Sequence, residues 1–233
     1  MFQPLVLRDV PSEIQEDCTE SQQSPFNRLH HSNQAIPLRR PLVPALACRH
    51  HSSHPPRLPP RATQRRPIRI LELGSGTGVV GIAAAAILGG SVTVTDLPHV
   101  LPNIQFNVKA NAETLNLHGG AVEVAALSWG DTHNMEAIGR EFDLIIGSDL
   151  VYHDHLYEPL LETLTFFLLE SEKRIVFLMA HEKRWKKESA FFKKAKKFFD
   201  VEIIHKDEPS NGSRVGVVVY RFVGKLNPKS ADP

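Results

Sequence analysis

A glycine-rich turn at residues 72–78, Glu-Leu-Gly-Ser-Gly-Thr-Gly, constrains this chain more than any other feature. It follows an apolar run, Ile68 to Leu73, with the length of a β-strand, and leads into an Ala-rich run, Gly78 to Leu88, that predicts a buried helix. A strand, a glycine-rich turn and a helix in this order present backbone N–H groups to a ligand, and glycine permits close approach because it lacks a Cβ. The turn therefore predicts a site for a nucleotide-like ligand.

The residues that follow repeat the alternation of strand and helix, which is typical of βαβ units and a parallel sheet. Pro209-Ser210-Asn211-Gly212 separates the last two apolar runs, which predict a closing hairpin. We therefore expect an α/β fold, a Rossmann-like seven-stranded sheet that is mostly parallel, with a C-terminal antiparallel hairpin and helices on both faces. The further expected strands are Ser91–Thr95, Val122–Ala126, Phe142–Gly147, Arg174–Ala180, Val201–His205 and Val215–Phe222, and the further expected helices are Val100–Leu115, His155–Leu169 and Lys187–Phe199.

The first 66 residues differ in composition from the rest. Between Glu20 and Glu72 there is no acidic residue and no Lys, but there are nine Pro and nine Arg. Such a segment buries too little apolar surface to offset its ordering entropy. We expect residues 1–66 to be mostly disordered, residues 67–226 to form the domain and residues 227–233 to be a tail. A transit peptide is the alternative, against which the five acidic residues within the first 20 argue.

The overall composition excludes several classes of protein. The 27 Lys and Arg against 26 Asp and Glu provide no global field that would attract nucleic acid or an acidic membrane. Both cysteines, Cys18 and Cys48, precede the glycine-rich turn, so the predicted domain has no thiol for a disulfide. Apolar stretches such as Val79–Leu88 are too short for a membrane span. We expect a soluble monomer in the cytoplasm or nucleus, without membrane or nucleic-acid partners.

Asp96 lies at the end of the second expected strand, roughly 20 residues beyond the turn, where a carboxylate accepts both hydroxyls of a ribose. Residues 76–81 also match the dinucleotide pattern G-x-G-x-x-G. In that pattern the first glycine directly follows the strand, whereas here Leu73-Gly74-Ser75 intervenes, and the Glu72 carboxylate would repel a pyrophosphate. A nucleoside that carries a positive charge fits better. Close packing of helix and sheet is the purely structural alternative.

Further motifs occur in order along the predicted domain. They are Ile70–Gly81, Thr95-Asp96-Leu97, Leu127-Ser128-Trp129-Gly130, Phe142–Tyr152 and His181-Glu182-Lys183-Arg184. Over about residues 67–222 this series resembles the seven-strand methyltransferases of family 16, the methyltransferase-like 21 group of protein-lysine methyltransferases. The resemblance implies S-adenosyl-L-methionine (SAM) as the cofactor and a protein, such as a chaperone or translation factor, as the substrate.

The resemblance also assigns residues. It implies that Asp96 binds the ribose, that Trp129 lies beside the adenine, and that Asp149 and Tyr152 form the D-x-x-Y element of the acceptor channel. His181-Glu182 occupies the Tyr-Glu position of the family, which implies a lining role for the substrate. The SAM-binding residues implied are Glu72, Gly74, Ser75, Gly76, Asp96, Leu97, Trp129 and Ser148.

Elementary chemistry is consistent with these roles. Methyl transfer from a sulfonium requires a positioned neutral amine and the exclusion of water. We expect Asp149 to orient that amine and Tyr152 to form a wall of the acceptor channel. The structural alternatives are a core position for Trp129 and a helix N-cap for Asp149.

Two other patterns are explained without a functional site. His153 and His155 lack a third metal ligand, so we expect no metal site. The Lys-rich segment 183–197 also carries Phe191, Phe192, Ala195, Phe198 and Phe199 at helical spacing, which favours a solvated face over a nucleic-acid surface.

The expected function is therefore protein-lysine N-methylation. A small-molecule or RNA methyltransferase on the same fold is one alternative, because the fold leaves the acceptor to loops. The other is a SAM-binding isoform with little activity, since the Trp-containing N-terminal segment that the resemblance implies is not recognisable: the two tryptophans are Trp129 and Trp185. An altered reading frame across residues 30–66 would account for this difference.

Overall fold

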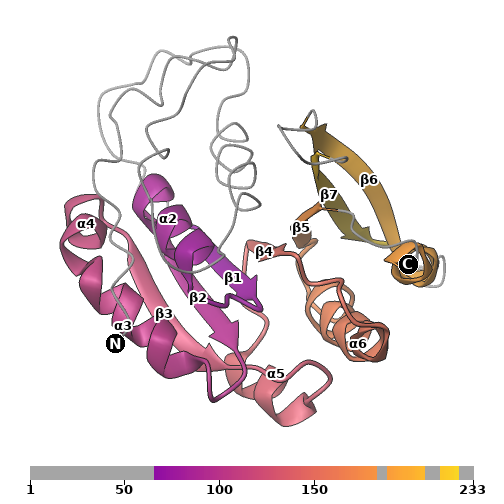
Figure 1. The fold of residues 1–233 in the computed structure, drawn as a ribbon, viewed down its shortest axis with the longest axis horizontal. Coiled ribbons are helices and arrows are strands. Elements are labelled where there is room, and N and C mark those ends of the chain that lie inside the picture. The colour runs from indigo at the N-terminus through magenta and orange to yellow at the C-terminus, as the bar shows by residue number, and fades with distance from the viewer. Residues whose placement is uncertain (1–65, 183–187, 208–215, 226–233) are drawn as a thin grey trace.

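The computed structural model describes residues 66–182, 188–207 and 216–225, which form one sheet with helices on both faces (Figure 1). The first half of the described chain contains β1 (Arg69–Leu73), α2 (Val79–Leu88), β2 (Ser91–Asp96), α3 (Leu101–Ala110), α4 (Ala112–Leu117) and β3 (Ala121–Ala126). The second half contains α5 (Thr132–Ile138), β4 (Leu144–Ser148), the 3₁₀ turn η4 (Asp154–Leu156), α6 (Tyr157–Leu168), β5 (Val176–Glu182), α7 (Glu188–Phe198), β6 (Phe199–Lys206) and β7 (Val217–Gly224).

The seven strands are arranged in the order β3-β2-β1-β4-β5-β7-β6. Strands β1 to β5 are parallel, whereas β7 pairs antiparallel with both β5 and β6. The chain runs from β1 outward to β2 and β3, then returns to place β4 on the other side of β1. The carboxyl ends of β1 and β4 therefore flank the switch point where open α/β sheets bind ligands. The expected fold class is confirmed.

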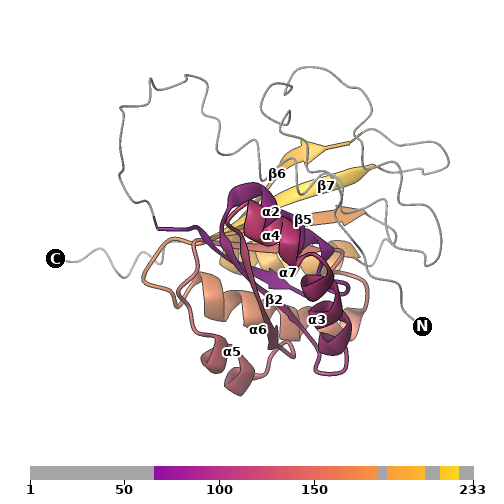
Figure 2. The ribbon, with the colours of Figure 1, turned by 90° about the vertical axis from the view of Figure 1, so that its left-hand side faces the viewer.

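Side chains that alternate along the strands build two cores. Ile70 of β1 belongs to the core beneath α2, α3 and α4, whereas its neighbour Leu71 belongs to the core beneath α5, α6 and α7. Both side chains are completely buried. Figure 2 shows the helices separated into these two layers. Because helices cover both faces of the sheet, its strands have nearly continuous apolar sequences. This is the pattern from which the strands were predicted.

Two helical predictions differ from the structure. The single helix expected at Val100–Leu115 is two helices, because Asn111 leaves the helical conformation with φ −107° and ψ 11°. Its side-chain amide donates to the carbonyl of Asn107 at 2.8 Å, which offers the backbone an alternative to continued helix. The sequence analysis also missed α5. Its start is capped by the Asp131 side chain, which accepts from the backbone N–H of Asn134.

Some predictions lie outside the described residues. These are the disorder expected for residues 1–65, the hairpin turn at Pro209–Gly212 and the tail at residues 227–233. The domain boundaries therefore stay predictions. Within the described ranges, no helix has both the length and the apolarity that crossing a bilayer requires.

Candidate functional site

The glycine-rich turn adopts a backbone that favours glycine. Gly74, Gly76 and Gly78 have φ values of 57°, 60° and 77°. A Cβ at Gly74 would lie 2.9 Å from Leu150 Cδ2 and 3.0 Å from Trp129 Cζ2, closer than side chains tolerate. Both the left-handed conformation and the close neighbours therefore require glycine at position 74.

Hydrogen bonds from β2 hold the turn in place. The backbone N–H of Ser75 donates to the carbonyl of Thr95 at 2.9 Å, and the backbone N–H of Thr95 donates to Ser75 Oγ at 3.0 Å. The Thr95 hydroxyl also donates to the carbonyl of Glu72 at 2.7 Å. Ser75 and Thr95 are fully buried. The side chain of Ser75 thus anchors the turn to β2, a role that the sequence analysis did not foresee.

Glu72 is buried beneath the turn. Its Oε2 atom accepts the backbone N–H of Gly81 in the first turn of α2 at 3.0 Å. Gly81 has no room for a side chain, because a Cβ there would lie 2.6 Å from the same Oε2 atom. The carboxylate therefore fixes the start of α2 on β1, beneath the predicted ligand site.

Asp96 connects the turn to the end of β2. Its Oδ2 atom accepts the backbone N–H of Gly76 at 2.7 Å, and its Oδ1 atom accepts the backbone N–H of Leu97 at 2.8 Å. The Leu97 side chain is 43% exposed. The structure thus brings together three of the residues predicted to bind the cofactor.

Trp129 lies beside the turn rather than inside the core. It is partly buried and packs against the α5–α7 core from its border. Its ring edge contacts the position where Gly74 would carry a side chain. Trp129 therefore takes part in the packing of the core while it borders the turn, which leaves both its predicted adenine contact and the alternative core position open.

Asp149 follows β4 in a strained conformation, with φ of 55°. Its backbone N–H donates to the carbonyl of Ala180, and its Oδ1 atom accepts the backbone N–H of Glu182 at 3.2 Å. No described helix starts at this residue, since η4 begins at Asp154. The helix N-cap alternative is therefore wrong. A non-glycine residue in this region of φ costs free energy and is a recognised mark of functional sites.

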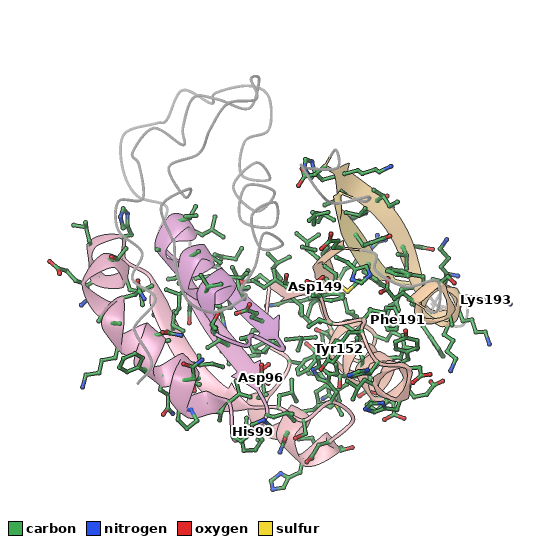
Figure 3. The ribbon with its side chains drawn as sticks, viewed as in Figure 1. Asp96, His99, Asp149, Tyr152, Phe191 and Lys193 are labelled. Carbon is green, nitrogen blue, oxygen red and sulfur yellow. The ribbon has the colours of Figure 1, made fainter. Side chains whose placement is uncertain are left out.

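Ser148 and Tyr152 bracket the same loop. Ser148 ends β4, in register with Ala180 of β5. Tyr152 is 49% exposed, and the pKa of its phenol is raised by burial and then by the negative charge of Asp96. Figure 3 shows Asp96, Asp149 and Tyr152 around the middle of the molecule, at the ends of β2 and β4.

The site contains one buried residue that the sequence singled out, His181, and two that it did not, Glu188 and Asn107. His181 is 2% exposed, and its Nε2 atom lies 2.9 Å from Oε2 of Glu188, which is equally buried. Asn107 donates its side-chain amide to the carbonyl of Thr77, whose own hydroxyl is buried and has no hydrogen-bond partner among the described residues. The motif had drawn attention to His181, but no pattern pointed to Glu188 or Asn107.

The structure also shows the histidine pair and the described part of the Lys-rich segment, for which we expected no functional site. The rings of His153 and His155 stack 5.4 Å apart, and no group of three potential metal ligands occurs among the described residues. In α7, Phe191 and Ala195 are completely buried, whereas the lysines of the described part are exposed. Phe198, expected on the buried face, is 44% exposed, because the chain leaves α7 for β6 at this point.

A separate cavity of about 310 Å³ lies between α5 and the strands β1 to β3. Arg69, Thr93, Glu123 and His133 are among its lining residues, which include none of the predicted site residues.

Comparison with known proteins supports the same chemistry. The profile of a family described as lysine methyltransferase matches residues 49–198. EEF1A lysine methyltransferase 3 of Xenopus tropicalis is 44% identical over 98 residues, which cover 42% of this chain and 41% of that protein. Protein-lysine methyltransferase METTL21E of Bos taurus is 35% identical over 164 residues, covering 70% of this chain and 52% of that protein. The chain spans about half the length of these relatives.

A solved structure shares the fold. The predicted O-methyltransferase Atu636 from Agrobacterium tumefaciens superposes with a TM-score of 0.54 at 16% identity, over 71% of this chain and 78% of that one.

Proposed function

This chain belongs to the lysine methyltransferase family, and on that premise we propose that it transfers a methyl group from SAM to the side-chain amine of a lysine in a folded protein. SAM is the cofactor, as in magnesium protoporphyrin IX methyltransferase, a solved structure with the same fold that has SAM bound. The observation that carries the proposal is the hydrogen bond of 2.7 Å that joins Gly76 of the turn to the Asp96 carboxylate. It supports the proposal because it joins the turn that we expect to bind the nucleoside to the carboxylate that we expect to bind its ribose.

The residues present fit SAM. Gly74 lets the ring edge of Trp129 pack directly against the turn, and the face of such a ring is suited to an adenine. Asp96 would bind the ribose hydroxyls, and Leu97 beside it offers an exposed apolar surface. The hydroxyl of Thr77, which has no hydrogen-bond partner in the described part of the chain, supplies a further polar group at the turn. Glu72, although engaged with α2, adds negative charge that suits a cationic ligand better than a pyrophosphate.

The acceptor side of the site is the loop after β4. SAM supplies an electrophilic methyl group on a sulfonium. With SAM bound, the neutral lysine nitrogen would take the methyl group as the S–C bond breaks, the electron pair of that bond would stay on sulfur in S-adenosylhomocysteine, and the proton lost by the lysine ammonium would pass to solvent water. We assign the orientation of the amine to Asp149 and the wall of its channel to Tyr152. The strained backbone of Asp149 and its hydrogen bond to Glu182 support this role, because they fix the carboxylate before a substrate arrives.

The relatives suggest which protein to test first. One of them carries the name EEF1A lysine methyltransferase, so EEF1A is our first candidate acceptor. A location in the cytoplasm or nucleus is also part of the proposal, supported by the absence of cysteine from residue 49 to the end of the chain. Imaging of the tagged full chain in cells tests that location.

The decisive experiment uses the purified full chain, labelled SAM, purified EEF1A and, in parallel, a cell lysate. Label on a lysine, located by mass spectrometry, supports the proposal, and calorimetry measures SAM binding separately. Label in RNA or small metabolites, with none in protein, would reject it in favour of a different acceptor. SAM binding without any transfer would identify the chain as a SAM-binding isoform with little activity.

A further inference from the structure

Asn107, in the second half of α3, contacts the glycine-rich turn directly. Its side-chain nitrogen Nδ2 donates a hydrogen bond of 2.9 Å to the backbone carbonyl of Thr77, and the residue is only 4% exposed. Because a carbonyl oxygen can only accept, the nitrogen of the side-chain amide must be the atom that faces it. A buried polar side chain of α3 therefore holds the turn that we expect to bind the cofactor.

A second residue of α3 packs against the next position of the turn. Ile104 is completely buried, and its Cγ2 atom lies 2.9 Å from the place where Gly78 would carry a Cβ. Ile104 and Asn107 are three residues apart, so they lie on the same face of the helix. This face of α3 thus makes one apolar and one polar contact with adjacent residues of the turn.

The hydrogen bonds of the turn show what the Asn107 contact adds. The backbone N–H of Gly76 donates to Oδ2 of Asp96 at 2.7 Å, and the backbone N–H of Gly78 donates to the carbonyl of Ser75 at 2.9 Å. The glycines on both sides of Thr77 allow the backbone many other conformations. A turn with Thr77 reoriented would lose its bond to the buried Asn107 amide. The amide therefore favours one orientation of the Thr77–Gly78 peptide.

We infer that Asn107 is a positioning residue for the cofactor, one that holds the Thr77–Gly78 peptide in the shape that binds SAM before SAM arrives. This role rests on the proposed function only in taking SAM as the ligand of the turn. When a binding site spends part of its time in other conformations, its apparent affinity falls by the fraction of time that it is competent. Asn107 thus raises the affinity for SAM without touching it.

Asn107→Leu tests this role, because leucine has a similar size but no amide. The net contribution of one neutral hydrogen bond corresponds to a factor of about 3 to 10 in an equilibrium. We therefore expect the Kd for SAM, measured by calorimetry on the full chain, to rise about 3- to 10-fold. In turnover the KM for SAM should rise by the same factor while kcat at saturating SAM stays within about twofold, because bound SAM restores the shape of the turn.

Asn111→Leu is the matched control. Asn111 is 1% exposed, and its side-chain amide donates to the carbonyl of Asn107 at 2.8 Å, within the α3 segment itself. Asn111→Leu also removes a buried amide and should lower the melting temperature about as much as Asn107→Leu, but the Kd for SAM should stay within about twofold. An unchanged Kd in Asn107→Leu, or an equal rise in both variants, would overturn the positioning role.

A measurement on the wild-type chain tests the same role without a substitution. Coupling between two events is reciprocal, so if the Asn107 contact favours SAM, SAM must favour the Asn107 contact by the same factor. NMR of the full chain should show the side-chain amide hydrogens of Asn107 exchanging with solvent about 3- to 10-fold more slowly when SAM is added. Exchange that SAM leaves unchanged would overturn the positioning role, even if Asn107→Leu does not fold.

These measurements are independent of methyl transfer. If the wild-type chain binds SAM but methylates no protein, the proposed function fails, and the Kd values and the exchange rates still decide the role of Asn107. If methyl transfer is observed while Asn107→Leu binds SAM as the wild type does, the positioning role alone fails.

Discussion

The backbone N–H of Gly76 donates a 2.7 Å hydrogen bond to Oδ2 of Asp96, which joins the glycine-rich turn to the end of β2. The same carboxylate accepts the N–H of Leu97 through its other oxygen. Asp96 therefore shapes the turn while it offers the remaining lone pairs of its carboxylate to a ligand.

Asp96→Asn tests this double role. The amide keeps the size of the side chain but lacks the charge, and hydrogen bonds to a charged group are worth roughly 1.5–3 kcal/mol. We expect the Kd for SAM to rise about 10- to 100-fold in calorimetry, and the melting temperature to fall as well, because the amide can accept only one of the two backbone N–H groups that the carboxylate accepts. Glu136→Gln, on the exposed side of α5, is the control and should bind SAM as the wild type does. Unchanged affinity in Asp96→Asn would argue against ribose binding here.

Gly74→Ala tests the cradle beside Trp129. The new Cβ would lie about 3 Å from atoms of Leu150 and Trp129, and the alanine backbone would have to adopt a left-handed φ. Overpacking costs typically 1–3 kcal/mol, and the backbone conformation adds to this. We expect a loss of stability in urea unfolding and of SAM binding.

Gly119→Ala is the matched control, because Gly119 has φ of 68° but nothing within 4 Å of a Cβ. It should lose only the roughly 1–2 kcal/mol that a left-handed alanine costs. Equal losses of stability in Gly74→Ala and Gly119→Ala would show that backbone strain, and not the contact with Trp129, causes the loss in Gly74→Ala.

The sequence predicted what local patterns determine. The strands β1, β2, β4 and β5 follow from apolar runs such as Ile70–Leu73, and Asp96 and Asp149 were located because each directly follows a strand. In contrast, α5 was missed because its seven residues, Thr132–Ile138, bury only Met135 and show no helical stripe. A cue was present in Asp131, a favoured N-cap residue, and in Gly139 after the last turn.

The buried network around the site could not be predicted for a different reason. His181 and Glu188 are close in sequence, but they belong to β5 and α7, and their contact depends on how those elements pack. The anchoring of Ser75 by Thr95 likewise depends on the parallel pairing of β1 and β2. Such contacts are tertiary and leave no periodic signal in the sequence.

The tyrosines predict how stability depends on pH. The pKa values of Tyr152, Tyr157 and Tyr220 are raised by burial first, then by nearby carboxylates: Asp96 for Tyr152, Glu188 and Asp154 for Tyr157, and Glu188 for Tyr220. A pKa raised in the folded state gives stability that is present below the unfolded pKa of about 10 and is lost as the pH rises through the folded value. We expect the phenolate absorbance of the folded protein to rise at higher pH than that of the protein unfolded in urea, and stability to fall above about pH 10. A tyrosine that ionises below that pH would contradict this.

Helix α7 allows a test of its two faces. Phe191 is completely buried and lies toward α6 in Figure 3, whereas the exposed Lys193 lies on the outer side of the helix. Phe191→Ala should destabilise the protein by about 3–5 kcal/mol, the usual cost of removing a buried phenylalanine ring. Lys193→Ala should change the free energy of unfolding by no more than about 0.5 kcal/mol. Chemical denaturation measures both, and a large loss in Lys193→Ala would mean that this face has a partner.

Asp149 is the residue on which the proposed transfer depends most directly. Asp149→Asn retains an oxygen that can accept the N–H of Glu182, and asparagine tolerates the left-handed φ of 55°. It removes only the charge, so we expect SAM binding to persist while the single-turnover rate of methyl transfer falls by about 100-fold, the effect typical of a lost positioning group. Asp149→Ala should lose a similar rate and also stability, because alanine adopts this φ at a cost of roughly 1–2 kcal/mol. A comparison of rate, SAM affinity and urea midpoint for the two variants separates chemistry from strain. Full transfer by Asp149→Ala, with SAM bound normally, would remove Asp149 from the mechanism and leave only its structural contacts.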